Sequence, residues 1–392
     1  MKNFLNVFGL SASLVIFVSA GCNQSDPPQF RLNMVEAVNN ELSPAYQQEV
    51  ANVLGAMFGT PDDPYAMPET GLDQGQLELA AGPAWSDEAG ANHGLYRKHC
   101  VQCHGVTGDG QGPTAQFLNP YPRDYRPGVY KFKSTYNPAR PTDDDLHRVL
   151  INGVPGTAMP SFSLLPGSEV EALVEYVKYL SIRGQMETEL IRYVYDELGV
   201  EEVEDENGEI TEQRIPLDPE KNPDQREAIN ELLADVVDGW ETANESIIVP
   251  SDEEIPEVDS RSPEELAASI AKGRELFYGV KANCIKCHGP TCLGDGQQDD
   301  HDIWNKAHKN FLESLAATTK MMEEGKDVDD PMYDTKLEVA DTFYPVRNAI
   351  PRNLRQGVYR GGRRRIDLFW KIYAGIAGTP MPGFGPASAG AA

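Results

Sequence analysis

The stretch Cys100-Val101-Gln102-Cys103-His104 decides how this chain is interpreted, and its pattern recurs at Cys284-Ile285-Lys286-Cys287-His288. Both stretches read Cys-x-x-Cys-His, which is typical of the covalent attachment of a c-type haem. One helical turn between the two cysteines places both thiols where they can reach the two vinyl groups of one porphyrin. The adjacent imidazole then points at the iron. The sequence therefore predicts two covalently bound c-type haems.

Two other interpretations of Cys-x-x-Cys are open at this point. A zinc half-site would need two further ligands of the right type nearby. A thioredoxin-like redox dithiol would follow a strand in a β-α-β context, which this sequence lacks. The occurrence of two such motifs, each followed directly by histidine, favours haem over both.

The sequence around the two motifs is also repeated. Residues 122–130 (PRDYRPGVY) match residues 351–359 (PRNLRQGVY), and residues 156–162 (GTAMPSF) match residues 378–384 (GTPMPGF). The shared order indicates duplication of one domain type. Met159 and Met381 fall at the same place in the second pair, each before a proline, so we interpret them as the sixth iron ligands rather than core filler.

These residues resemble the class I c-type cytochromes over residues 90–183 and 262–385. The resemblance implies a mainly α-helical fold with two cytochrome c domains. It also implies that the carbonyl of Pro113, at the end of the loop Gly108-Asp109-Gly110-Gln111-Gly112-Pro113, accepts a hydrogen bond from His104 and tunes the iron. The family ends in a helix packed on its first helix. Here that helix is expected over residues 168–181, with Ser168 and Glu171 as a capping box and one apolar face.

The second unit departs from the family in three ways. Its loop, residues 289–296 (GPTCLGDG), has no Gly-Pro at the matching place, and an insertion of roughly residues 298–345 lengthens the path to Met381. The chain stops at Ala392 without the final helix. Either the sequence is truncated or another segment or chain covers that haem, and a degenerate second unit with no haem is a further alternative.

The N-terminus predicts export. Residues 1–22 combine Lys2, an apolar run and Ser19-Ala20-Gly21-Cys22, which resembles a bacterial lipobox with Cys22 as the lipidated residue. Plain secretion is the alternative. Both place the protein outside the cytoplasm, and lipidation anchors it to a membrane facing the periplasm. The 392 residues carry 61 acidic and 34 basic side chains, a net charge of −27, which argues against nucleic-acid binding.

The remaining sequence divides into linking segments. Residues 23–89 are expected to be a spacer with one short helix around Val50–Phe58. Residues 184–261 are expected to be an acidic linker, disordered or a solvated helix, because residues 196–265 contain 25 acidic and four basic side chains. Helical sequence resumes with a capping box at Ser262 and Glu265, which begins the second domain, residues 262–392.

Arginines close to both motifs are candidates for binding haem propionates, because guanidinium forms paired hydrogen bonds with carboxylates. We expect Arg123 or Arg126 in the first unit and Arg352 or Arg355 in the second. Histidines outside the motifs are interpreted as surface residues rather than ligands, with the two in the insertion, His301 and His308, as the strongest exceptions. Cys292 is interpreted as a small buried residue or free thiol rather than a disulfide partner.

The sequence thus favours a membrane-anchored dihaem cytochrome c that carries single electrons between redox partner proteins of a respiratory chain. The resemblance allows a role with, or within, a haem-copper terminal oxidase. On this hypothesis the protein is not itself an enzyme and has no nucleic-acid partner or small-molecule substrate. The alternative is a dihaem cytochrome c peroxidase, which would need one iron with an open sixth position.

Overall fold

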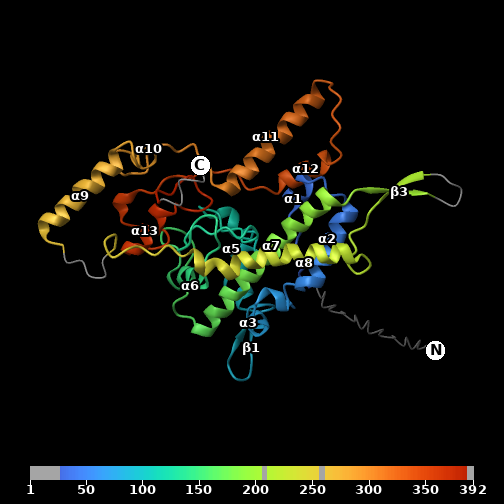
Figure 1. The fold of residues 1–392 in the computed structure, drawn as a ribbon, viewed down its shortest axis with the longest axis horizontal. Coiled ribbons are helices and arrows are strands. Elements are labelled where there is room, and N and C mark those ends of the chain that lie inside the picture. The colour runs from blue at the N-terminus through green and yellow to red at the C-terminus, as the bar shows by residue number, and fades with distance from the viewer. Residues whose placement is uncertain (1–26, 205–209, 256–260, 386–392) are drawn as a thin grey trace, which may run out of the picture.

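The computed structural model describes residues 27–204, 210–255 and 261–385, and these are mainly helical (Figure 1). Strands in this part of the chain form two small antiparallel hairpins. β1 (Trp85–Ser86) pairs with β2 (Asn92–His93), and β3 (Val200–Glu204) pairs with β4 (Ile210–Arg214). Because no larger sheet is present in the described ranges, the core is built by helix-on-helix packing.

The long helix α7 (Gly167–Glu197) is the axis of the N-terminal half, and it contains the predicted helix over residues 168–181. Its buried side chains form one core with those of α1 (Met34–Asn39), α2 (Pro44–Phe58), α3 (Gln74–Ala80) and α6 (Asp143–Asn152). The predicted capping box at Ser168 is wrong. Pro166 occupies the N-cap and the cap has no side-chain hydrogen bond, so the start of α7 depends on its packing.

Residues 27–89 are not an extended spacer. α2 buries Val50, Leu54 and Phe58 against α7, and Tyr179 on α7 donates a hydrogen bond to the Phe58 carbonyl. The same apolar positions that predicted a short helix required a partner surface, because an amphipathic helix is stable only when its apolar face is covered. The first unit therefore extends back to the start of the described residues.

The described part of the acidic segment is also structured. α8 (Pro223–Glu241) packs across α7 and buries Ile229, Leu233 and Trp240 from its inner face (Figure 1). The Trp240 indole Nε1 donates a hydrogen bond to Gln185 Oε1 over 2.9 Å. The expectation of disorder or a solvated helix is wrong for α8. Its apolar residues recur at helical spacing and form a buried face, and its carboxylates lie mainly between them, so a count of charges does not reveal that face.

The second unit begins with α9 (Pro263–Tyr278), where the structure confirms the capping box of Ser262 and Glu265. α10 (Ile285–His288) carries the second motif, and α13 (Arg365–Tyr373) precedes the Met381 loop. The insertion folds into α11 (Ile303–Glu323) and α12 (Tyr333–Asp341). These two helices form a small separate core with Val38 of α1, so the insertion ties the second unit to the N-terminal segment.

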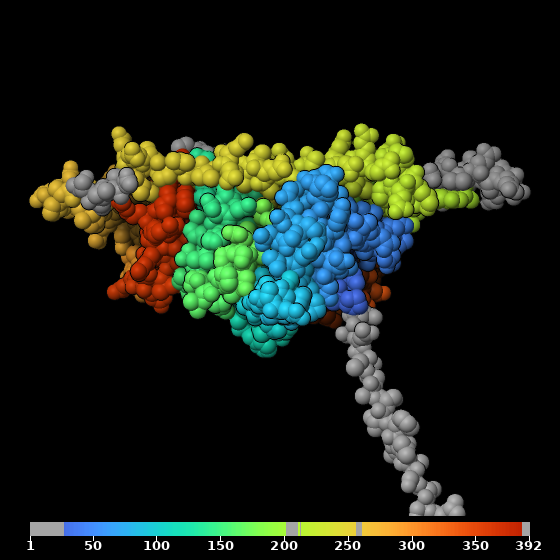
Figure 2. All heavy atoms as spheres, turned by 90° about the horizontal axis from the view of Figure 1, so that it is seen from below, coloured from blue at the N-terminus to red at the C-terminus, as the bar shows by residue number. Residues whose placement is uncertain are grey.

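The two units contact each other along a seam, which is the surface where residues 300–375 meet residues 116–154 and 246–248. The red C-terminal residues lie directly against the green residues of the first unit in Figure 2. Hydrogen bonds cross the seam from Asn137 Nδ2 to the Ala374 carbonyl (2.6 Å) and from Tyr121 Oη to the Pro345 carbonyl (2.9 Å). A further bond joins Trp370 Nε1 to the Ile248 carbonyl (2.9 Å).

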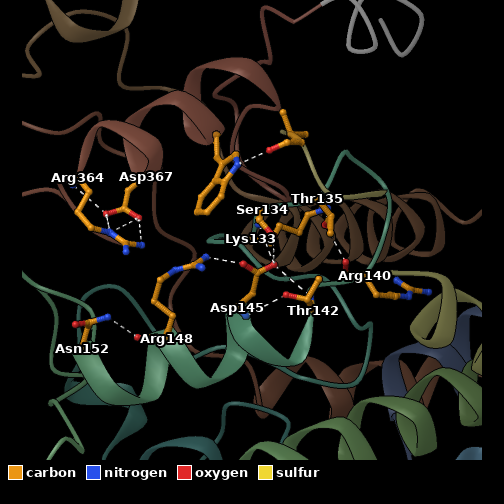
Figure 3. A network of polar contacts seen from close by, with 12 residues as sticks. Lys133, Ser134, Thr135, Arg140, Thr142, Asp145, Arg148, Asn152, Arg364 and Asp367 are labelled. Atoms are coloured by element: carbon orange, nitrogen blue, oxygen red, sulfur yellow. Dashed lines mark hydrogen bonds and ion pairs between the residues drawn. The ribbon is translucent and has the colours of Figure 1, made fainter. Parts of the chain in front are cut away.

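A buried carboxylate organises the first unit next to this seam. Asp145 on α6 accepts hydrogen bonds from the backbone and hydroxyl of Ser134 and from the Thr142 backbone, and it pairs with Arg148 (Figure 3). The Arg148 guanidinium in turn lies 4.9 Å from the ring centroid of Trp370 on α13. One fully satisfied acidic group thus links α6, the preceding loop and the second unit.

Residues 1–22, with the predicted export signal and Cys22, lie outside the described residues. Within the described residues, no helix combines the length and apolar character needed to cross a membrane.

The ion pair between Arg183 and Glu187 provides a test of the N-terminal packing. Glu187 is fully buried, pairs with Arg183 (2.7 Å) and accepts a hydrogen bond from the Asn33 backbone. We expect Glu187→Ala to lower the free energy of unfolding by about 3–5 kcal/mol, because it leaves a buried cation unpaired. Chemical denaturation followed by circular dichroism measures this.

Glu189→Ala is the matched control on the same helix, since the pair of Glu189 with Arg192 is largely exposed. It should change the free energy by no more than about 1 kcal/mol. Equal effects of the two substitutions would contradict the packing of residues 27–43 on α7.

Candidate haem site

The first motif lies at one end of a cavity of about 190 Å³. Cys100, Cys103 and His104, at the junction of α4 (Leu95–His99) and α5 (Val101–His104), line it together with Met159. The other walls are largely apolar side chains from α6, α7 and the intervening loops: Leu118, Leu146, Val149, Leu150, Val154, Phe162, Leu173, Val174 and Val177. The structure therefore brings the predicted thioether, proximal and distal residues of the first unit to one apolar cavity.

The ring of His104 is held by a backbone carbonyl. Its Nδ1 donates a hydrogen bond to the carbonyl of Arg123 over 3.0 Å, and the phenol ring of Tyr125 stacks on it with centroids 4.6 Å apart. A carbonyl only accepts, so the proton must be on Nδ1 and the lone pair on Nε2. Burial lowers the pKa of His104 to about 4, although the bond to Arg123 partly opposes this. The imidazole is thus neutral at pH 7, the form that binds metals.

The predicted role of Pro113 in this hydrogen bond is wrong. The acceptor is the Arg123 carbonyl, although the neighbouring Gly112 is tightly packed, with a Cβ there 2.4 Å from the Val101 carbonyl oxygen. Pro113 itself is exposed. The loop residues before it nevertheless position the true acceptor. Gly110 has a φ of +75°, and a Cβ there would lie 2.8 Å from the Pro122 carbonyl oxygen, next to Arg123.

Met159 is presented by a tight loop between α6 and α7. Its backbone N–H bonds to Thr157 Oγ1 (3.1 Å), and its carbonyl accepts from the Val154 N–H (3.1 Å). Gly153 begins this loop with a φ of +61°, and a Cβ there would lie 2.5 Å from the Pro160 backbone. The loop is therefore rigid, and the half-buried Met159 side chain contacts the core as well as the cavity.

The second motif has the same local geometry. His288 Nδ1 donates a hydrogen bond to the carbonyl of Arg352 (3.1 Å), and Arg352 matches Arg123 in the repeat. The Met381 N–H bonds to Thr379 Oγ1 (3.3 Å), and the Met381 carbonyl accepts from the Ile376 N–H (3.1 Å). Both halves of the predicted ligand pair thus sit in backbone settings equivalent to those of His104 and Met159.

The position of Cys292 corresponds to that of Gly108 in the first unit. In the first unit the Gly108 carbonyl accepts from the Tyr125 N–H, and in the second the Cys292 carbonyl accepts from the Leu354 N–H (2.8 and 2.9 Å). Cys292 therefore takes the place of Gly108, and it has the same left-handed conformation, with a φ of +61°. It is half-buried and forms no disulfide.

The alternatives of a redox dithiol and a zinc site fit the structure poorly. A reactive dithiol needs a lowered thiol pKa, whereas burial raises the pKa of Cys100 to about 12. Structural zinc needs four ligands, and no group of three or more His, Cys, Asp or Glu placed to hold a metal ion occurs in residues 27–204, 210–255 and 261–385.

The four arginines expected to bind haem propionates lie in different surroundings. Arg126 is bound to Asp124 through two side-chain hydrogen bonds, and Arg355 is exposed. Arg123 lines the cavity, as predicted for a propionate ligand. Arg352 has a buried Nε without a hydrogen-bond partner, as does Arg360, which also lines the first cavity. The unpaired buried donor of Arg360, next to an apolar cavity, fits a ligand that brings its own carboxylates.

Sequence reasoning missed three residues of this site. Arg360 comes from the other unit, so only tertiary structure could place it here. Tyr125 stands two residues after Arg123, and its stacking on His104 has no sequence signature. His99, interpreted as a surface residue, lines the cavity with a buried Nε2 that has no partner. His308 instead stacks on Phe343 inside the insertion, with centroids 4.1 Å apart.

Comparison with known proteins agrees with this geometry. The family model described as "Cytochrome C oxidase, cbb3-type, subunit III" matches residues 87–177. No curated protein is significantly similar to the chain. A solved structure, the Kuenenia stuttgartiensis reducing HAO-like protein complex Kustc0457/Kustc0458, aligns with 19% identity and a TM-score of 0.40, covering 74% of this chain and 85% of that chain. The family-model match shows that the first unit contains a cytochrome c domain, the type of domain that holds a c-type haem and transfers electrons.

Gly110 allows a test of how the acceptor carbonyl is positioned. Gly110→Ala should lower the free energy of unfolding of the haem-containing protein by about 1–3 kcal/mol, because alanine is strained at this φ and its Cβ meets the Pro122 carbonyl. Gly167→Ala is the control, since a Cβ at the start of α7 meets nothing within 4 Å, and it should be neutral or stabilise by up to about 1 kcal/mol. Identical denaturation midpoints for the two variants would contradict this account of the loop.

Proposed function

We propose that this protein is an electron carrier with two c-type haems, one in each unit. The observation that carries the proposal is the repeated hydrogen bond from the motif histidine to a matched arginine carbonyl, at 3.0 Å for His104 and 3.1 Å for His288. The histidine and the arginine that accepts its hydrogen bond are 19 residues apart in the first unit and 64 residues apart in the second. Conservation of this contact despite the insertion supports two sites of one kind.

His104 and Met159 are the proposed iron ligands of the first site, and His288 and Met381 those of the second. Iron in such sites takes up and releases one electron, and a methionine opposite histidine raises its reduction potential. The chain's own part is to hold the imidazole neutral and oriented and to present the thioether from a rigid loop. The apolar wall excludes water and lowers the local dielectric constant.

The partners and location belong to the same proposal. The first unit matches a model named for a subunit of a cbb3-type cytochrome c oxidase, which supports exchange of electrons with redox proteins of a respiratory chain, including a haem-copper oxidase. The N-terminal sequence supports export and lipidation of Cys22, so that the protein works on the periplasmic side of a bacterial membrane. On this proposal, neither electron exchange nor attachment to the membrane involves a nucleic acid or a small-molecule substrate.

Intact mass of the exported protein tests the haem count. The wild-type chain should carry two covalent haems, and the pairs Cys100→Ala/Cys103→Ala and Cys284→Ala/Cys287→Ala should each carry one. A wild-type mass with one haem would show that the second unit is degenerate. A high-spin ferric haem with peroxidase turnover would overturn the carrier proposal in favour of the peroxidase.

Replacing the methionine ligands tests their assignment. Met159→Leu and Met381→Leu should each lower the midpoint potential of one haem, with a shift on the order of 100 mV, within the range of about 0.8 V that axial ligands span. Each should also remove the methionine-ligand absorption band of one ferric haem. Met321→Leu, on the exposed side of α11, is the control and should change neither haem. Unchanged potentials in the ligand variants would refute the assignment.

A further inference from the structure

Three cations gather where the second unit meets the first cavity. Arg123, Lys131 and Arg360 all line that cavity, and Arg360 is contributed by the second unit. Lys131 and Arg360 are matched positions of the repeat, since each follows the shared Val-Tyr pair. The equivalent segments of the two units therefore face each other across the seam, with their cations directed toward the same cavity.

Close packing holds this arrangement. Gly361 has a φ of +72°, and a Cβ there would lie 2.3 Å from the ring of Phe132, its counterpart in the repeat. The Arg123 guanidinium lies 3.4 Å from the ring centroid of Trp304 on α11, and that indole also contacts Gly378 in the Met381 loop. Residue 361, directly after Arg360, must therefore be glycine, and the tight turn there places Arg360 next to the first cavity.

The negative charge around these cations does not balance them. Asp302 pairs with Lys131 (3.0 Å), and Asp124, the other acidic group acting on Arg123, is bound to Arg126. The buried Nε of Arg360 has no hydrogen-bond partner. Burial, together with Arg123 and Arg360, lowers the pKa of Lys131 to about 8, although Asp302 opposes this shift. Burial together with nearby Arg352 lowers the pKa of Arg360. A half-buried cluster with excess positive charge calls for an anion.

We propose that Arg360 reaches across the seam to bind a propionate of the haem in the first unit, so that the second unit completes the first haem site. Arg123 and Lys131 share the carboxylate, and the guanidinium of Arg360 supplies the paired N–H donors that match it. This inference rests on the proposed function only in that a haem occupies the first cavity. It makes the potential of the first haem depend on docking of the second unit.

Arg360→Gln in the full haem-containing chain tests the contact. Removing a positive charge beside the haem favours the ferric form, so the first haem should become about tenfold easier to oxidise, a drop of about 59 mV for a one-electron couple. Spectroelectrochemical titration measures this, and the first haem is the one whose potential Met159→Leu moves. Arg363→Gln is the matched control, because Arg363 is an exposed arginine three residues further on, and it should leave both potentials unchanged.

A conservative pair covers the case in which Arg360→Gln does not fold. Arg360→Lys keeps the charge but loses the paired donors, so it should shift the propionate carboxylate band in the redox-induced infrared difference spectrum, and Arg363→Lys should not. Equal potentials in the two glutamine variants, or an unshifted band in Arg360→Lys, would overturn the inference. Absence of haem on Cys100 and Cys103 by mass would instead contradict the proposed function.

Discussion

The hydrogen bond from the His104 ring to the carbonyl of Arg123 is the interaction on which the candidate site depends. It fixes the proton on Nδ1 and leaves Nε2 for the iron. The acceptor is held by the close approach of Gly110 to Pro122, so the intervening loop acts as a template for one carbonyl. The second unit keeps this bond at His288 with a different loop sequence, which indicates that the contact, rather than any loop side chain, is what both sites require.

A second constraint comes from packing between segments that are remote in sequence. The N-terminal helices and α8 share one core with α7, and the insertion packs on α1 in a smaller core. α7 is the common partner of the N-terminal helices and α8. The seam then joins the two units through hydrogen bonds from side chains to backbone carbonyls and through the stacked pairs Arg123 with Trp304 and Arg148 with Trp370. The molecule is consequently one connected assembly of two units rather than two domains on a free linker.

The net charge of −21 in residues 196–265 does not reveal the helix that the segment contains. A count of charges does not show how the charges are distributed. In α8 the inner face is apolar and the outer face is acidic. The periodicity of Ile229, Leu233 and Trp240 was present in the sequence and could have been found. The apolar face of α2 is likewise evident from the sequence, whereas the α7 surface that covers it is set by the tertiary structure.

The sequence by itself determined the parts whose geometry is local. The Cys-x-x-Cys-His turns, the Met159 and Met381 loops and the cap at Ser262 depend on residues within one or two turns of each other, so their spacing carried the information. Only the tertiary structure decided that Arg123, and not Pro113, accepts from His104, because a backbone carbonyl is common to every residue and leaves no mark in the sequence. It also decided that Arg360 borders the cavity of the other unit, since contacts across a seam depend on how two folded surfaces meet.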